Sequence, residues 1–153
     1  VFNLFESTVR TKSGKKQDLE EVLFQQQYHT IYLMLGINEL GYDYSSIIRK
    51  YQSVVDTIKT RQPNAVIVLG ANLHVTAQKS SSSSTYTNEK INQINSGIRA
   101  IAENSDCCYI DVNSIFDDEN GALKTSYSTD GSHVLGKYYS VWTDWLKGES
   151  PDA

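Results

Sequence analysis

The chain contains the stretch Thr30-Ile31-Tyr32-Leu33-Met34-Leu35, a continuous apolar run that ends at Gly36. Such a run is typical of a strand that is buried on both faces, as in a parallel sheet. A second run, Ala65–Gly70, has the same character, and the residues between them include Tyr44–Arg61, whose apolar positions recur with helical spacing. The stretch therefore predicts a buried strand, a crossover helix and a second buried strand.

The same alternation continues toward the C-terminus. Thr87–Asn104 is predicted as a helix and Cys108–Val112 as a third internal strand. Ser132–Leu146 is predicted as a closing helix that buries Leu135, Tyr138, Trp142 and Trp145. The polar segments Asn72–Thr85 and Ser114–Ser128 are expected to be mostly loop. Strands that alternate with helices of this length predict an α/β fold with a mostly parallel sheet, covered on both faces.

The N-terminal part is less regular. Val1–Phe5 alternates apolar and polar residues and is predicted as a strand, Glu6–Lys16 as a loop, and Asp18–Gln27 as a short amphipathic helix. Because the chain begins without Met and inside a predicted strand, we expect residues 1–153 to be a truncated or processed form of one domain.

Composition excludes several classes of protein. A chain of 153 residues is large enough for one domain with a hydrophobic core. The net charge of −4 argues against nucleic-acid binding and against attraction to an anionic membrane, and no apolar run reaches the length of a membrane span. The two cysteines, Cys107 and Cys108, are adjacent, which disfavours a mutual disulfide, and two ligands do not make a zinc site. No metal or cofactor is predicted. The location of the protein stays open between secretion, the cell envelope and the cytoplasm.

A possible site lies near the C-terminus, in Asp130-Gly131-Ser132-His133. In a turn that leads into a helix, residues three apart can face one another. The carboxylate of Asp130 would then fix the tautomer of His133 and leave the other ring nitrogen free as a base. The alternative is a helix N-cap with a surface histidine beside it.

A second motif, Gly36-Ile37-Asn38-Glu39, follows the first buried strand. The glycine allows a tight turn, and the amide of Asn38 is able to donate to a developing oxyanion. Ordinary turn chemistry also favours Gly and Asn. Because sites in such sheets lie beyond the carboxyl ends of the strands, this loop, the loop after Leu69 and the Asp130–His133 segment are expected to converge.

Together, the two motifs resemble the SGNH (GDSL-type) hydrolase family, and the resemblance covers the order of elements from residue 1 to about residue 147. It implies a three-layer α/β/α flavodoxin-like domain that hydrolyses esters without a metal. Gly36 and Asn38 match the family's oxyanion-hole block. Asp130 and His133 match the block that contributes two members of a Ser–His–Asp triad.

The chain departs from the family at two points. Glu39 stands where the family usually has an Asp that supports the loop, and no segment matches the Gly-Asp-Ser block that carries the nucleophile. We expect that serine upstream of residue 1, on a first strand that belongs in the middle of the sheet, because its loss would leave backbone groups unpaired. The chain alone is then expected to be inactive, with an N-terminal fragment of the same protein as the partner that completes the sheet.

Weaker expectations concern the walls of the site. Glu39, Tyr42 and His74 are predicted to border the substrate, and Tyr44 and Tyr86 are further aromatic residues suited to an acyl or sugar site. The serine run at residues 80–84 has the composition of a flexible lid, which is a poor mount for a nucleophile.

The sequence thus predicts a serine esterase or acylhydrolase that cleaves small carboxylic esters, whether of lipids, short acyl groups or O-acetylated carbohydrates. A first alternative is a catalytically silent binding module of the same fold, for carbohydrate. A second is a flavodoxin-like cofactor or signalling domain, which would leave Asp130 and His133 unexplained.

Overall fold

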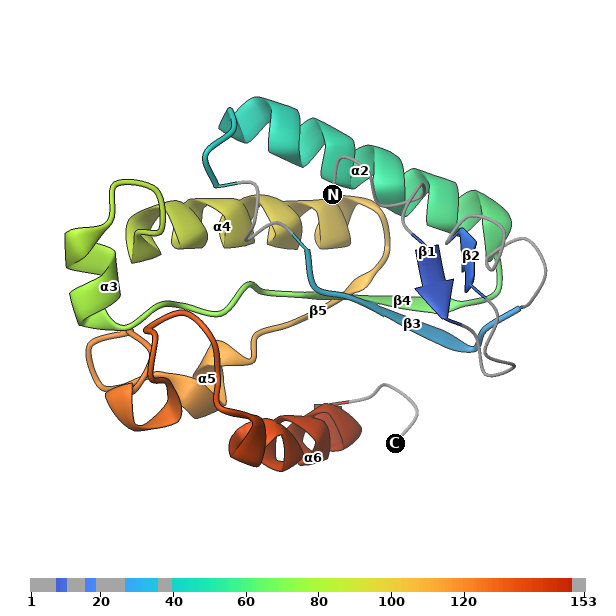
Figure 1. The fold of residues 1–153 in the computed structure, drawn as a ribbon. Helices are drawn as coiled ribbons and strands as arrows, with labels where there is room; N and C mark the ends of the chain where they lie inside the picture. Colours follow the sequence, from blue (N-terminus) through green and yellow to red (C-terminus); the bar gives the residue numbers. More distant parts are fainter. Residues whose placement is uncertain (1–7, 11–15, 19–26, 36–39, 150–153) are drawn as a thin grey trace.

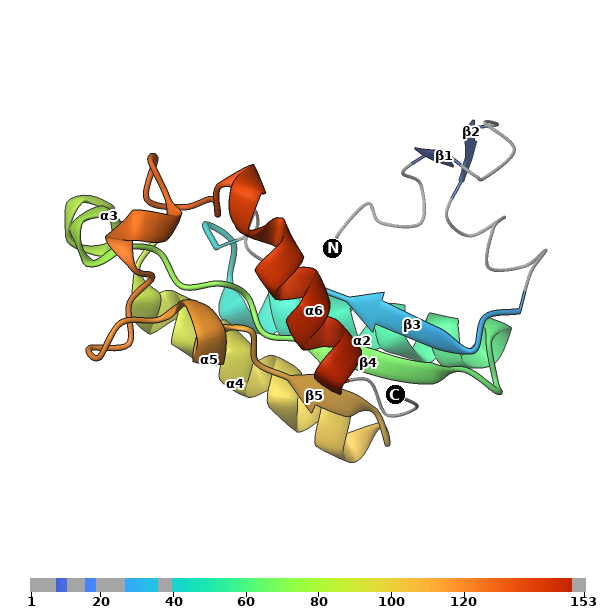
Figure 2. The ribbon, with the colours of Figure 1, turned by 90° about the horizontal axis from the view of Figure 1, so that it is seen from below.

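Three parallel strands form a sheet that lies between two layers of helices (Figures 1 and 2). The computed structural model describes residues 8–10, 16–18, 27–35 and 40–149. The strands are β3 (Thr30–Leu33), β4 (Val66–Gly70) and β5 (Cys108–Ile110), and β4 lies in the centre. The predicted α/β/α layering is therefore confirmed.

Helices α2 (Tyr44–Arg61) and α4 (Asn88–Asn104) cover one face of this sheet (Figure 1). Both were predicted from their apolar spacing, and both begin at a side-chain cap: Asp43 accepts from the backbone of Ser46, and Thr87 accepts from that of Lys90. Their inward stripes pack on the sheet and form the main core, which includes Ile47, Val54, Val55, Ile58, Ile91, Ile98 and Ile101.

The two outer strands are more exposed than predicted. In β3, Tyr32 is 41% exposed and only Leu33 is buried, and all of β5 is half-buried. Each of these strands pairs only with β4 in the described part of the chain. The apolar runs predicted burial on both faces for all three strands, but only β4 is buried in this way. The reason is that burial also requires neighbouring elements on both sides of a strand.

Two predicted loops contain helical turns. Helix α3 (Ala77–Ser82) interrupts Asn72–Thr85, because the Thr76 side chain accepts from the backbone of Lys79 and caps the helix. Part of the serine run is thus helical rather than an open loop. The segment Ser114–Ser128 is likewise structured, by α5 (Asn113–Phe116) and the 3₁₀ turn η3 (Thr125–Tyr127).

The closing helix starts later than predicted. A 3₁₀ turn, η4 (Gly136–Tyr138), leads into α6 (Tyr139–Glu149), and Ser132 lies outside both. The reason is that Asp130 forms a separate turn, described below. The four side chains expected inside this helix are only partly buried, and Tyr138, Trp142 and Trp145 pack against a second, smaller core of Val112, Phe116, Leu123 and Val134.

Near the N-terminus, β1 (Thr8–Arg10) pairs antiparallel with β2 (Lys16–Asp18). The predicted loop Glu6–Lys16 therefore contains strand residues, and Asp18 ends a strand instead of starting a helix. The strand predicted at Val1–Phe5 and most of the helix predicted to Gln27 lie outside the described residues.

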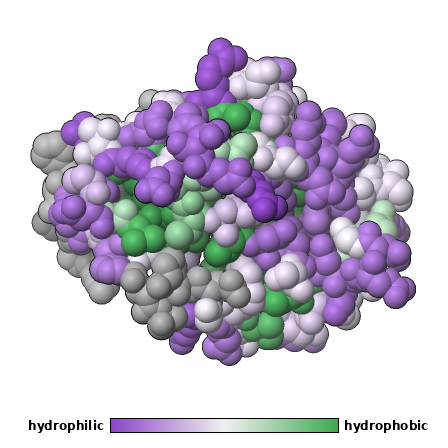
Figure 3. Space-filling view, turned by 180° about the vertical axis from the view of Figure 1, so that it is seen from behind, coloured by the Kyte–Doolittle hydropathy of each residue, from purple (hydrophilic) through white to green (hydrophobic). Residues whose placement is uncertain are grey.

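The face shown in Figure 3 is largely hydrophilic, with apolar residues in small separate patches. Among the residues that the structure describes, no helix is both long and apolar enough to cross a membrane.

We predict that Tyr51→Phe does not destabilise the protein and raises its free energy of unfolding by up to about 1 kcal/mol. Tyr51 is fully buried in α2, and its hydroxyl finds no partner among the described residues. Urea unfolding measures the effect, with Tyr32→Phe, at the exposed position of β3, as the control, expected within about 0.5 kcal/mol of the parent. A loss of stability in Tyr51→Phe would show that this hydroxyl is bonded.

Candidate active site

The turn from Asp130 to His133 holds its two functional side chains together. Nδ1 of His133 lies 2.8 Å from Oδ2 of Asp130. The other carboxylate oxygen accepts the backbone N–H groups of Ser132 and His133, each at 2.8 Å, and the hydroxyl of Ser128 at 3.1 Å. Asp130 therefore organises its own turn, and it does so without capping a helix.

These donors hold the pKa of Asp130 well below its ordinary value, chiefly through the backbone N–H of His133, then that of Ser132, then the imidazole ring. A carboxylate only accepts hydrogen bonds, so Nδ1 of His133 must carry the proton between them. In the neutral ring, Nε2 is then left unprotonated. The pair thus has the arrangement of an oriented base, although both side chains are exposed, His133 by 82% and Asp130 by 55%.

His133 and Asp130 lie on the rim of a hollow of about 450 Å³. Its wall includes Met34, which follows β3, and Asn72 and Leu73, which follow β4. The segment after β4 therefore meets the Asp130–His133 turn, as predicted. The loop Gly36–Glu39, which was predicted to join them, lies outside the described residues. The remaining lining is mainly aromatic or apolar, from Tyr86, Val134, Tyr139 and Trp142, with Lys79 and Ser132 at its polar side.

Gly131 fixes the turn against the segment that follows β4. Its carbonyl accepts the N–H of Thr76 at 2.9 Å, and its φ of +85° lies in the region that favours glycine. A Cβ at this position would come within 2.9 Å of Thr76 Oγ1 and of the Cβ of Lys79. Only glycine fits this close approach, so the turn is seated on residues 76–79.

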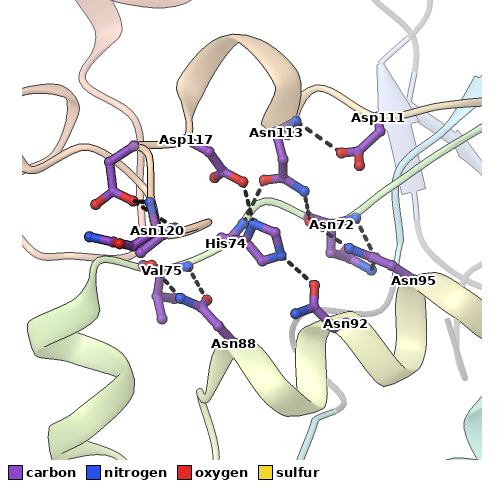
Figure 4. Close-up of polar contacts among 12 residues, drawn as sticks. Asn72, His74, Val75, Asn88, Asn92, Asn95, Asp111, Asn113, Asp117 and Asn120 are labelled. Atoms are coloured by element: carbon purple, nitrogen blue, oxygen red, sulfur yellow. Dashed lines mark hydrogen bonds and ion pairs between the residues drawn. The ribbon is translucent and has the colours of Figure 1, made fainter.

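Asparagine side chains in turn hold that segment in place (Figure 4). Asn95 accepts the N–H of Asn72 at 2.8 Å and donates to its carbonyl at 3.0 Å. Asn88 makes the same two-way contact with Val75, at 2.8 and 2.9 Å. Asn113 donates to the carbonyl of Asn72 and accepts the N–H of His74. These amides replace the strand partners that the backbone loses when it leaves the sheet.

His74 belongs to this supporting network. Its Nδ1 lies 2.8 Å from Asp117 Oδ2 and its Nε2 lies 2.5 Å from Asn92 Oδ1. Burial raises the pKa of the Asp117 carboxyl, and the hydrogen bond from His74 opposes that rise. The ring, in a residue only 8% exposed, does not line the hollow beside His133. Its predicted place at the border of the substrate stays a prediction.

The structure describes only some of the other expected site residues. Gly36, Asn38 and Glu39 lie outside the described residues. Tyr42 is 64% exposed and does not line the hollow, whereas Tyr86 does. The described residues bring together no group of three or more His, Cys, Asp or Glu side chains able to hold a metal ion.

Sequence reasoning missed the asparagines. Asn88, Asn92 and Asn95 are spaced four and three residues apart, which places them on one face of α4. The sequence thus contained one signal, a polar stripe beside the apolar stripe of this helix. It did not indicate that the polar stripe faces the segment after β4.

Comparisons with known proteins bear on the family and on the fold of this chain. The model of the GDSL-like lipase/acylhydrolase family matches residues 6–139. The comparison with curated proteins found no match.

Among solved structures, one from Streptococcus pneumonia, whose description refers to platelet activating factor, superposes with a TM-score of 0.70 at 24% identity and covers 78% of this chain and 58% of its own. A GDSL-like lipase from Bacteroides thetaiotaomicron superposes with a TM-score of 0.63 at 19% identity. The match covers 78% of this chain and 60% of the lipase. A peptidoglycan O-acetylesterase superposes with a TM-score of 0.67 at 17% identity. The match covers 88% of this chain and 41% of the esterase. The chain thus spans about three fifths or less of the length of these three structures.

We predict that Asn95→Ala lowers the free energy of unfolding by about 1–3 kcal/mol, because it leaves the buried N–H of Asn72 without an acceptor. Urea unfolding measures the loss. Asn104→Ala, at an exposed position of the same helix, is the matched control and is expected within about 0.5 kcal/mol of the parent. Equal effects of the two substitutions would contradict the assigned role of Asn95.

We also predict that Asp130→Asn makes stability less sensitive to acid. A pKa that is lower in the folded than in the unfolded state stabilises the fold above the unfolded value, about 3.9, and this contribution is lost as the pH falls toward the folded value. The parent should therefore lose more stability than the variant between about pH 7 and about pH 3 in urea unfolding. Asp144→Asn, exposed on α6, should behave as the parent. The same acid loss in parent and Asp130→Asn would contradict the strong bonding of this carboxylate.

Proposed function

This chain belongs to the GDSL-like lipase/acylhydrolase family, and on that premise we propose that it forms the base-bearing part of a serine esterase that cleaves carboxylic esters. The single observation that carries the proposal is the bond of 2.8 Å between His133 and Asp130 on the rim of the hollow. A hydrogen-bonded histidine and carboxylate beside a partly apolar pocket suit acyl transfer by a Ser–His–Asp triad.

In the proposed mechanism, a serine attacks the ester carbonyl while Nε2 of His133 takes its proton. The imidazolium formed in this step is stabilised by Asp130, which stays ionised, and it then protonates the leaving alcohol. The family resemblance assigns the oxyanion to the amide of Asn38, with Gly36 shaping that loop.

The nucleophile is proposed to lie upstream of residue 1, in a Gly-Asp-Ser block that follows a strand beside β3. Supporting this position, β3 pairs only with β4 among the described residues, and Tyr32 on it is 41% exposed. A parallel strand along that edge would bring its carboxyl end to the end of the sheet where His133 lies. An N-terminal fragment of the same protein is thus the proposed partner.

The proposed substrates are small esters of lipids, short acyl groups or O-acetylated carbohydrates. Two of the solved structures with this fold are described as a peptidoglycan O-acetylesterase and an acetyl xylan esterase, so acetylated polysaccharides belong in the first substrate panel.

Turnover of p-nitrophenyl acetate by the full-length protein tests the proposal. We predict that His133→Ala lowers kcat by about 10³-fold or more, as expected when a triad loses its base. His29→Ala, at an exposed histidine outside the hollow, is the matched control and should retain the parent rate. A fluorophosphonate probe should label the parent protein. Unchanged turnover in His133→Ala would refute the assigned base, and a silent probe would favour the binding module.

A further inference from the structure

Lys79 lies between two hollows that share the Asp130 turn. On one side it lines the hollow of about 450 Å³ that holds His133. On the other side it lines a hollow of about 270 Å³ that does not include His133. Lys79 and Asp130 are common to both linings, so a substrate that fills both must pass the lysine.

The side chain of Lys79 is held at both ends. Its Cβ and Cγ lie beside Gly131, at the close approach that admits only a glycine. Its ammonium lies 5.9 Å from the centre of the Tyr86 ring, within the range of a cation–π contact. Tyr86 lines the hollow that holds His133, so this contact keeps the charge beside that hollow.

This positive charge has no carboxylate partner in the part of the chain that the structure describes: the ion pairs there join His74 with Asp117, Arg99 with Glu103 and His133 with Asp130. Asp130 itself is occupied by four donors from Ser128, Ser132 and His133. The second hollow adds neutral hydrogen-bonding side chains, from Thr76, Gln78, Ser82, Thr125, Ser128 and Thr129.

We infer that the substrate is an ester that also carries an anionic group, a carboxylate or a phosphate, and that Lys79 binds this group. The ester lies in the hollow of His133 and the anion lies at the boundary with the polar hollow, where hydroxyl and amide groups donate to its other oxygens. Lys79 is a specificity-determining residue in this account, and the inference rests on the proposed esterase function for the position of the ester.

Binding of unreactive amide analogues tests the inference separately from catalysis. The probes are 4-acetamidobenzoate, its neutral counterpart 4-acetamidobenzamide, and 4-acetamidophenyl phosphate, titrated into the full-length protein by NMR. We expect either anionic probe to bind about tenfold more tightly than the neutral one, equal to about 1.4 kcal/mol. Preference for the carboxylate or for the phosphate then identifies which anion the site takes.

The test variant is Lys79→Met, which keeps the apolar stem against Gly131 and removes only the charge. It should lose the preference for anions and bind the neutral probe as the parent does, and Lys79→Arg should retain the preference. Lys137→Met is the matched control, because Lys137 also lies over a tyrosine ring, at 5.1 Å, but lines neither hollow.

Equal affinity for all probes in the parent, or an equal loss for charged and neutral probes in Lys79→Met, would overturn the inference. Failure of the proposed function is recognised independently, as an absence of p-nitrophenyl acetate turnover. An anion preference that depends on Lys79 would stand even then.

Discussion

The site depends on how the backbone is bonded where β4 leaves the sheet. At Asn72 none of the described strands flanks the chain, yet the residue stays buried, and an unpaired peptide group there would cost about 1–3 kcal/mol. The amides of Asn95 and Asn113 take the place of those strands. These side-chain hydrogen bonds fix the segment that runs from Asn72 to Thr76. The turn that contains His133 packs against this segment.

Two further sets of contacts connect this segment to the proposed base. Thr76 donates to the carbonyl of Gly131, and the absence of a side chain on Gly131 lets the turn approach closely. Asp130 then gathers backbone and side-chain donors and orients His133. His133 is itself exposed, so its position is determined by this hydrogen-bonded chain and not by packing around the ring. Rigid support of an exposed base is what a preorganised site requires.

Periodicity predicted helices α2 and α4 closely, because their apolar stripes and caps are local features. It predicted the neighbours of the strands less well: an apolar run such as β3 does not reveal which edge is paired. The Asp130–His133 pair was also predictable, since both residues lie in one turn. By contrast, the partners of His74 come from Asn92 and Asp117, which are 18 and 43 residues away. Nothing in the local sequence indicates such contacts, and the prediction that this ring borders the substrate rested only on its position just after a strand.

The central claim is that Asp130 holds His133 with Nδ1 protonated and Nε2 free to act as a base. The most direct measurement is the tautomer of His133 from the ¹⁵N chemical shifts of its ring, assigned by comparison with His133→Ala. For the neutral form of the ring, the account predicts the proton on Nδ1 in the parent, and a shift toward the Nε2-protonated tautomer when Asp130 is replaced by Ala. A ring that is protonated on Nε2 in the parent, or a tautomer that does not respond to the loss of Asp130, would contradict it.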